Sequence, residues 1–171
     1  MVINNWIQYI IYFLFIVLLQ GLVVNNLQIG VYAYPMIYIL AILVLPFEFG
    51  IIATLGIAIV LGVFMDALSD TFGLHTSATV FIAYSRPMIL KVLKPRDGYE
   101  LALMPTIHDM GILWFSAYFS IAIVVHHIWF FILEIFRFDL IGLIALKIIV
   151  SSFLSFCILF GLQYLLYKPS K

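Results

Sequence analysis

Six long apolar stretches, separated by short polar or turn-forming segments, take up most of this 171-residue chain. A helix needs about 20 apolar residues to cross a hydrocarbon core of about 30 Å, and each stretch comes close to that length. The stretches cover residues 7–24, 29–45, 48–68, 74–93, 111–133 and 140–167. The sequence therefore predicts an all-α membrane protein, a six-transmembrane-helix bundle that forms one domain over residues 1–171.

The composition supports this class and argues against several others. Hydrophobic residues make up 66% of the chain and charged residues 9%, against about 45–50% and 25% in soluble domains. The 8 basic and 8 acidic residues balance, so no nucleic-acid partner is indicated. The single cysteine, Cys157, leaves no intrachain disulfide and no cysteine cluster for zinc. No cofactor or metal is expected.

The basic residues lie only in the second half of the chain, because residues 1–85 contain no Lys or Arg. Four of them form a cluster at the end of the fourth stretch: Arg86, Lys91, Lys94 and Arg96. Lys168 and Lys171 follow the sixth. Positive residues stay on the cytoplasmic side of a membrane, so both groups are expected inside, as are both termini. The predicted outer loops are then 25–28, 69–73 and 134–139.

The third stretch carries small and polar residues at intervals of four: Gly50, Thr54, Ala58, Gly62, Asp66 and Asp70. Small residues at this spacing let a second helix approach closely. The ridge predicts a close helix contact, either within the monomer, with a partner helix or in a homo-oligomer.

Asp66 is the main polar candidate, because a carboxylate one turn inside a membrane helix is costly unless it is paired or hydrated. Asp70 and His75 lie at a similar depth. The turn over residues 69–76 offers hydrogen-bond partners, especially Ser69, Thr71 and Thr76. Lys147 offers a charged one, since its stem can reach several ångströms along the helix; otherwise it snorkels to the interface alone.

Other polar residues have simpler explanations. Glu48 is expected to form an interfacial charge pair with Lys91 or Lys94. Arg86 precedes Pro87, which frees a backbone carbonyl that the guanidinium could satisfy.

Two further sets of polar residues lie in the last two stretches. His126 and His127 are about 100° apart on a helix and share a metal poorly. Ser151 and Ser155 continue an i+4 ridge from Lys147, and serine hydroxyls commonly bond their own helix or a neighbour. Nucleophile–base pairs and phosphate loops are not evident in the sequence, so we expect no enzyme.

The third stretch and the turn after it resemble the rod shape-determining MreD family. The family pattern is a Gly, an apolar run to an Asp, a short Ser/Gly turn, a Leu-Gly pair and a helix ending in Tyr. Gly62, Asp66, Gly73 and Tyr84 occupy these places, with Phe72 where Leu is common. The positions of Pro35 and Pro46 are also similar. By motif, the resemblance covers about residues 30–90.

The resemblance implies a non-enzymatic subunit of the bacterial inner (cytoplasmic) membrane, in the elongasome that supports peptidoglycan synthesis and cell shape. It implies a single-span partner like MreC, the MreB filament system and the wall-synthesis complex. The basic cluster would meet anionic membrane lipid. The inner loop over 94–110 departs from the family pattern.

A second hypothesis is the substrate-binding membrane component of an energy-coupling-factor transporter, which also has six helices. Its polar cavity would need groups such as Asp66, Asp70, His75, His126 and Lys147. The sequence shows no ligand motif, and likeness of fold does not establish function.

Overall fold

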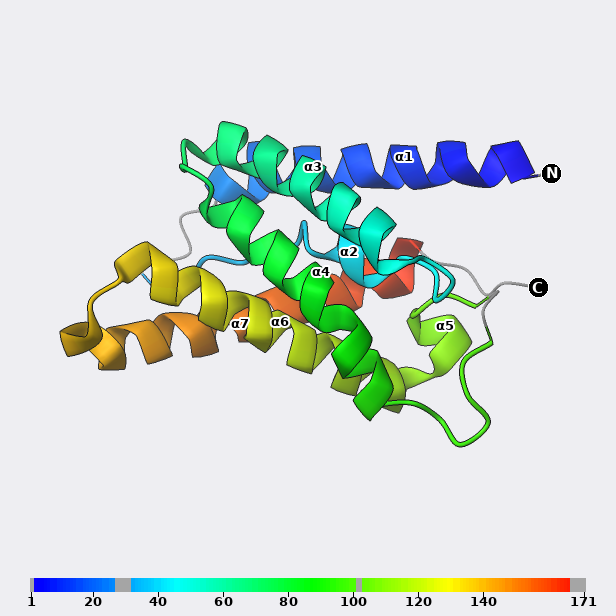
Figure 1. The fold of residues 1–171 in the computed structure, drawn as a ribbon. Helices are drawn as coiled ribbons and strands as arrows, with labels where there is room; N and C mark the ends of the chain where they lie inside the picture. The colour runs from blue at the N-terminus through cyan, green and yellow to red at the C-terminus, as the bar shows by residue number, and fades with distance from the viewer. Residues whose placement is uncertain (1, 27–31, 101–102, 167–171) are drawn as a thin grey trace.

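The computed structural model describes residues 2–26, 32–100 and 103–166, and all regular structure in that part of the chain is helical (Figure 1). The α-helices are α1 (Val2–Leu18), α2 (Leu40–Leu43), α3 (Ile51–Ser69), α4 (Leu74–Val92), α5 (Ile107–Met110), α6 (Ile112–Ile135) and α7 (Ile141–Leu166). A π-helical turn, Leu19–Val23, and a 3-10 turn, Val24–Asn26, extend α1, and a second 3-10 turn, Phe138–Leu140, precedes α7.

The long helices have the character of a membrane protein. Three described segments are long and apolar enough to cross a membrane: Ile51–Ser69, Ile112–Ile135 and Phe138–Leu165. A shorter apolar helix covers Ile10–Asn26. Five of the six predicted stretches correspond to α1, α3, α4, α6 and α7, with ends displaced by a few residues.

The prediction of a helix over 29–45 is wrong for residues 32–39, which form no helix, and only α2 is helical within 32–45. Residues 27–31 lie outside the described part. The physical reason is local: Pro35 has no N–H to donate, and the residue before a proline is driven toward extended backbone. Residues 32–45 are called the central segment below.

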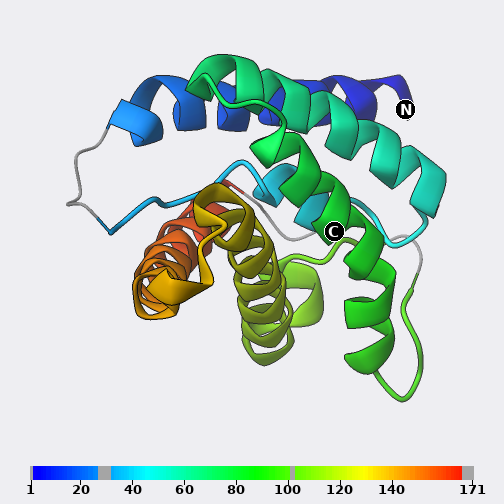
Figure 2. The same cartoon turned by 60° about the vertical axis from the view of Figure 1, so that its left-hand side comes forward.

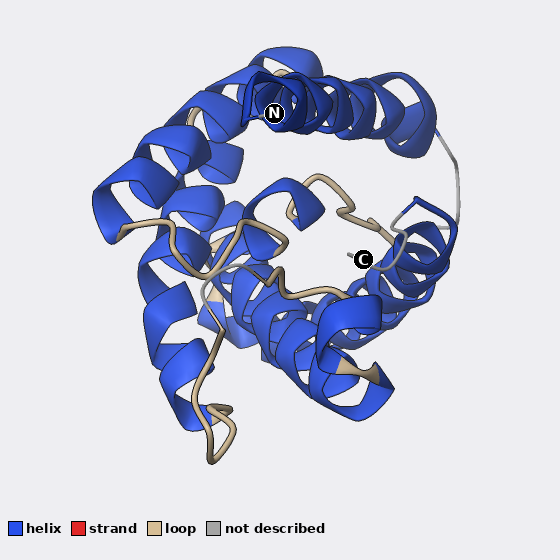
Figure 3. Cartoon of the chain, turned by 90° about the vertical axis from the view of Figure 1, so that its right-hand side faces the viewer, coloured by secondary structure: helices blue, strands red, loops and turns tan. Residues whose placement is uncertain are grey.

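The five long helices surround the central segment, as the view along the bundle shows (Figure 3). From another side, α1 and α3 lie above it and α6 and α7 below it (Figure 2). Ile37, Tyr38, Ile39 and Leu40 have no exposed surface. An irregular backbone inside an apolar bundle needs hydrogen-bond partners from its neighbours, because each unsatisfied group costs several kcal/mol there.

The start of α1, the α4–α6 connection and the end of α7 lie at one end of the bundle (Figure 1). This end is called the inner end, and the opposite one the outer end. At the outer end, α3 turns into α4 through two residues with positive φ, Asp70 (52°) and Gly73 (85°). Glycine adopts this backbone without a steric cost, and Asp is among the few side chains that tolerate it.

At the inner end, the loop over 94–110 is attached to the bundle by aromatic rings. Tyr99 stacks on Phe47 with ring centroids 4.4 Å apart, and Trp114 packs edge-on against both. The Tyr99 hydroxyl donates to the Leu90 carbonyl at 2.8 Å. Burial raises the pKa of Tyr99 above its usual value. The part of the loop around Tyr99 is therefore docked, and α5 lies in the second half of the loop.

Candidate functional site

The backbone of the central segment is held by polar side chains from the surrounding helices. Gln20, in the π-helical turn after α1, is 2% exposed. Its amide nitrogen donates to the Pro35 carbonyl at 3.1 Å, and its oxygen accepts from the Ile37 N–H at 2.6 Å. The Gln20 side chain thus satisfies the backbone carbonyl of the residue before Met36 and the backbone N–H of the residue after it.

Two serines of α7 continue this attachment. Ser151 accepts from the Tyr34 N–H at 3.0 Å and donates to the Tyr32 carbonyl at 3.3 Å. Ser155 accepts from the Met36 N–H at 2.8 Å. Ser151 and Ser155 therefore bond the central segment. The sequence alone could not show that this segment is their neighbour.

The inner end of the central segment is held by Tyr118 and Arg86. Tyr118 donates to the Leu43 carbonyl at 3.2 Å. Arg86 donates to Tyr118 at 3.2 Å and to the carbonyls of Leu45 and Pro46. The Leu45 and Pro46 carbonyls follow α2. A buried cation donates to both, and the Pro46 carbonyl also accepts from the Phe49 N–H at 3.2 Å.

The sequence-based description of Arg86 needs two corrections. Arg86 is buried, whereas Lys91, Lys94 and Arg96 are exposed, so it does not belong to an exposed basic cluster. Its bonds go to the chain after α2, not to a carbonyl freed by Pro87. The side chain was expected to support its own helix, but it joins α4 to the central segment.

The Tyr38 cluster lies in the middle of the bundle. The hydroxyl of Tyr38 is 2.8 Å from Nδ1 of His75 on α4 and 3.0 Å from Nε2 of His126 on α6. Both imidazole rings stand edge-on to the tyrosine ring. The three side chains come from three separate elements and are all buried.

His127 belongs to a second chain of hydrogen bonds. Its Nδ1 is 2.8 Å from the Ile123 carbonyl, which only accepts, so the ring proton lies on Nδ1. Its Nε2 then accepts from the Ser155 hydroxyl at 3.2 Å. His126 and His127 are used separately, and no group of three or more metal-binding side chains gathers among the described residues.

Asp66 is the centre of the α3–α4 turn. Its carboxylate accepts from the hydroxyls of Thr71 and Thr76, each at 2.6 Å. It also accepts from the backbone N–H of His75 at 2.9 Å and of Thr76 at 3.0 Å. Of the partners expected from sequence, Thr71 and Thr76 bond it; Ser69 instead accepts from Asn25 at 2.9 Å.

Lys147 does not pair with Asp66. Its ammonium group lies 2.9 Å from the Glu134 carboxylate, near the outer end of α6. It also lies over the rings of Tyr34 and Phe131, 4.8 and 5.4 Å from their centroids. Neither alternative considered for Lys147, a pair with Asp66 or snorkelling alone, is what the structure has, because α6 and α7 form an antiparallel hairpin that brings Glu134 within reach.

The small-residue ridge faces α4 over part of its length. Thr54, Ala58 and Gly62 are buried, whereas Gly50 and Asp70 are exposed and flank α3 as its caps. Thr79 of α4 donates to the Ala58 carbonyl at 2.9 Å. The middle of the ridge is thus an internal helix contact.

The expected pairing of Glu48 with Lys91 or Lys94 does not form. The ion pairs between described residues are Arg137–Asp139 and Lys147–Glu134. Glu48 is exposed beyond Pro46.

Sequence reasoning also missed several residues that hold this site: Gln20, Tyr38, Tyr118 and Glu134. A glutamine within an apolar stretch was one signal that could have identified Gln20. Tyr38, Tyr118 and Glu134 gave no such signal, because tyrosines are frequent in this chain and Glu134 lies near a predicted loop.

The arrangement attaches the chain to itself. Its serine–histidine contact, Ser155 with His127, is fully buried, and the Ser155 oxygen also accepts from the Met36 N–H. Comparison with known proteins found no match among family models, curated proteins or solved structures. Function is therefore inferred from the geometry and from the motif in α3 and its turn.

Proposed function

We propose that this chain is a non-enzymatic scaffold or assembly subunit of the bacterial inner membrane, similar to the rod shape-determining MreD proteins. In this role it would support peptidoglycan synthesis and cell shape as part of the elongation machinery. The observation that carries the proposal is that Gly62, Asp66 and Gly73, which carry the resemblance, act together in the α3–α4 hairpin.

Each of the three has a distinct part in that hairpin. A Cβ on Gly62 would overlap the Thr76 backbone, 2.9 Å from its nitrogen. Asp66 accepts four hydrogen bonds from the turn and the start of α4. Gly73 adopts φ of 85° at the start of α4. A motif that fixes one helix pair is suited to a protein that presents a helical surface.

The use of the buried polar groups also favours a scaffold. Gln20, Ser151, Ser155, Tyr118 and Arg86 all bond the central segment. Their hydrogen bonds hold the bundle in one shape. Apart from the buried central segment and the loop after α4, the described residues lie in helices and short connections, so a partner would meet helix faces and loops.

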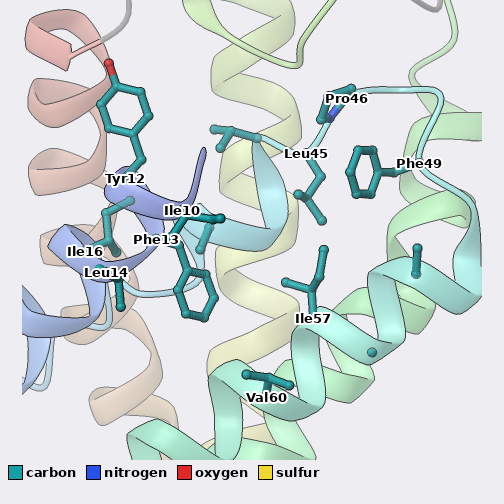
Figure 4. A pocket seen from close by; sticks show the side chains of 14 residues that line it. Ile10, Tyr12, Phe13, Leu14, Ile16, Leu45, Pro46, Phe49, Ile57 and Val60 are labelled. Atoms are coloured by element: carbon teal, nitrogen blue, oxygen red, sulfur yellow. The ribbon is translucent and has the colours of Figure 1, made fainter. Parts of the chain in front are cut away.

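A membrane-embedded surface for such a partner lies between α1 and α3 (Figure 4). This groove has a volume of about 600 Å³ and an almost wholly apolar lining, which includes Phe13, Leu45, Ile57 and Val60. Ala53 and Gly56 also line it, and a Cβ on Gly56 would meet nothing within 4 Å. Small residues let backbones approach closely, so the groove suits the single span of an MreC-like partner.

Co-purification tests this proposal. The tagged chain should retain a co-expressed single-span MreC-type protein, and it should restore rod shape in bacteria that lack their own MreD. Gly56→Leu fills the groove and should weaken retention. Ile52→Leu, at a side chain 84% exposed and outside the groove lining, serves as the matched control. If Gly56→Leu keeps both shape rescue and retention of the partner, the assignment of this groove is contradicted. If the unmodified chain fails in both assays, the scaffold role is contradicted.

The transporter alternative has less support. A transporter would need polar side chains free to face an open cavity. The candidates for this role all bond protein groups instead: Asp66, His75, His126 and Lys147. Mass spectrometry of the purified protein discriminates the two, because a substrate-binding component should retain a small molecule.

A further inference from the structure

The Tyr38 cluster has a hydrogen-bond arrangement that depends on where its protons lie. Tyr38 has one hydroxyl proton and faces two imidazole nitrogens, at 2.8 and 3.0 Å. Among the described residues, the hydroxyl also lies 4.0 Å from the Met36 sulfur, a weak acceptor. The hydroxyl can thus donate well to one ring while it accepts from the other.

Proton counting shows what this arrangement can hold. In the neutral cluster each imidazole carries one ring proton. If Tyr38 donates to Nδ1 of His75, the ring proton of His75 lies on Nε2, and Nε2–H of His126 donates to Tyr38. Moving both shared protons one step would then leave His126 with no ring proton at all, an imidazolate. The neutral cluster therefore cannot pass a proton through Tyr38.

One added proton removes this obstacle. With both nitrogens of His126 protonated, its Nε2 gives a proton to the Tyr38 oxygen, and the former hydroxyl proton moves to Nδ1 of His75. One N–H and one O–H bond break while one O–H and one N–H form. His126 ends neutral, Tyr38 is unchanged and the charge resides on His75.

The surroundings favour the charge on His75. The backbone N–H of His75 donates to Asp66 at 2.9 Å, and all four donors to this carboxylate are neutral groups. An imidazolium at His75 would give the buried anion a nearby opposite charge. On His126, Nδ1 is buried and has no hydrogen-bond partner in the described part of the chain, so a charged ring there is less well satisfied.

We propose that Tyr38, His75 and His126 form a buried site for one added proton, which the Tyr38 hydroxyl relays between the two imidazole rings. The proton resides preferentially on His75, the second residue of α4, near the outer turn. Because Tyr38 belongs to the central segment and the histidines to α4 and α6, proton binding changes the bonds that hold the segment between these helices.

The titratable and charged groups around the site are few among the described residues. Asp66 faces it from α3, and His127 lies beside His126 on α6, with ring centroids 5.4 Å apart. His127 is occupied by Ile123 and Ser155. From α7, Lys147 is paired with Glu134, and Arg86 on α4 serves the inner end of the central segment.

Histidine NMR of the full chain in lipid nanodiscs tests the proposal, with ring signals assigned from single His→Gln variants. Between pH 4 and 8, His75 and His126 should titrate together, with one midpoint and a total uptake of one proton. Tyr38→Phe should separate the two midpoints by more than about one pH unit. Asp66→Asn should lower the common midpoint by about one pH unit, because the counter-charge is lost.

His108→Gln, on α5 and away from the cluster, is the matched control and should leave the common midpoint in place. Where Tyr38→Phe does not fold, His75→Gln replaces it, and His126 should then no longer titrate at the former midpoint. Independent midpoints in the unmodified protein, no titration of either ring, or an unchanged pattern in Tyr38→Phe would overturn the proposal.

Discussion

The carboxylate of Asp66 accepts hydrogen bonds from both the backbone N–H and the hydroxyl of Thr76, at 3.0 and 2.6 Å. Asp66 lies one turn before the end of α3, and Thr76 is the third residue of α4. One turn earlier on α3, Gly62 leaves room for the Thr76 backbone. Thr76 is thus held by a close steric fit and by a carboxylate, which together set the angle of the α3–α4 hairpin.

Gly62→Ala should destabilise the protein by at least about 1–3 kcal/mol, because the new Cβ would overlap the Thr76 backbone. A backbone atom cannot move aside as the end of a side chain can. Thermal unfolding in detergent measures the loss, and Gly62→Leu should lose more.

Gly56→Ala is the matched control on the same helix, since its Cβ would meet nothing within 4 Å. Ile59→Leu, at a side chain 48% exposed, should also be mild. Equal tolerance at positions 56 and 62 would show that the close contact is not needed.

Asp66→Asn should cost about 1–3 kcal/mol. Each carboxylate oxygen accepts one hydroxyl and one backbone N–H. The amide group of Asn cannot accept at both ends, so one N–H of His75 or Thr76 would lose its partner. Asp66→Leu should cost more, because the N–H groups of His75 and Thr76 would then both lose their partner. Chemical unfolding of the two variants gives the order, and a fully stable Asp66→Leu would refute a structural role.

The sequence predicted the α3–α4 hairpin well because its information is local. Gly62, Asp66 and Gly73 lie close together in the chain, and the helix period alone places the first two on one face. Thr71 and Thr76 were named as partners of Asp66 for the same reason. Their contacts follow from helix geometry and a short turn.

The central segment could not be predicted in this way. Its apolar residues resemble a membrane helix, and hydrophobicity does not distinguish burial in protein from exposure to lipid. Pro35 interrupts the helix locally, but the side chains that satisfy the irregular backbone are Gln20, Ser151 and Ser155, and the two serines are more than 100 residues away in the chain. The error on Lys147 has the same origin, because its partner depends on which helices are neighbours.

Gln20→Met should destabilise the protein by about 2–4 kcal/mol, because it leaves the Pro35 carbonyl and the Ile37 N–H without the partners that Gln20 provides. The same change at Gln163 is the control. Gln163 is fully buried, and neither its amide nitrogen nor its oxygen has a hydrogen-bond partner among the residues that the structure describes. Gln163→Met should be neutral or stabilising. Similar losses at both sites would mean that the attachment of the central segment contributes little.

Lys147 and Glu134 should show a coupling energy of about 0.5–1 kcal/mol in a double-mutant cycle with Lys147→Met and Glu134→Gln, because the pair is partly exposed. The cycle between Lys147→Met and Asp66→Asn should be additive. Coupling in the second cycle instead of the first would restore the Asp66–Lys147 pair, which the sequence left open as one alternative.

Single-cysteine labelling tests the proposed orientation, in which both termini and the loop over 94–110 are cytoplasmic. The background is Cys157→Ser, since Cys157 is exposed. Phe72→Cys and Arg137→Cys lie in the two outer turns and are exposed, so a membrane-impermeant maleimide should reach them from outside intact cells. Arg96→Cys should react only after the membrane is opened, because an excess of basic residues keeps this loop on the cytoplasmic side. Labelling of Arg96→Cys in intact cells, with Phe72→Cys protected, would reverse the orientation.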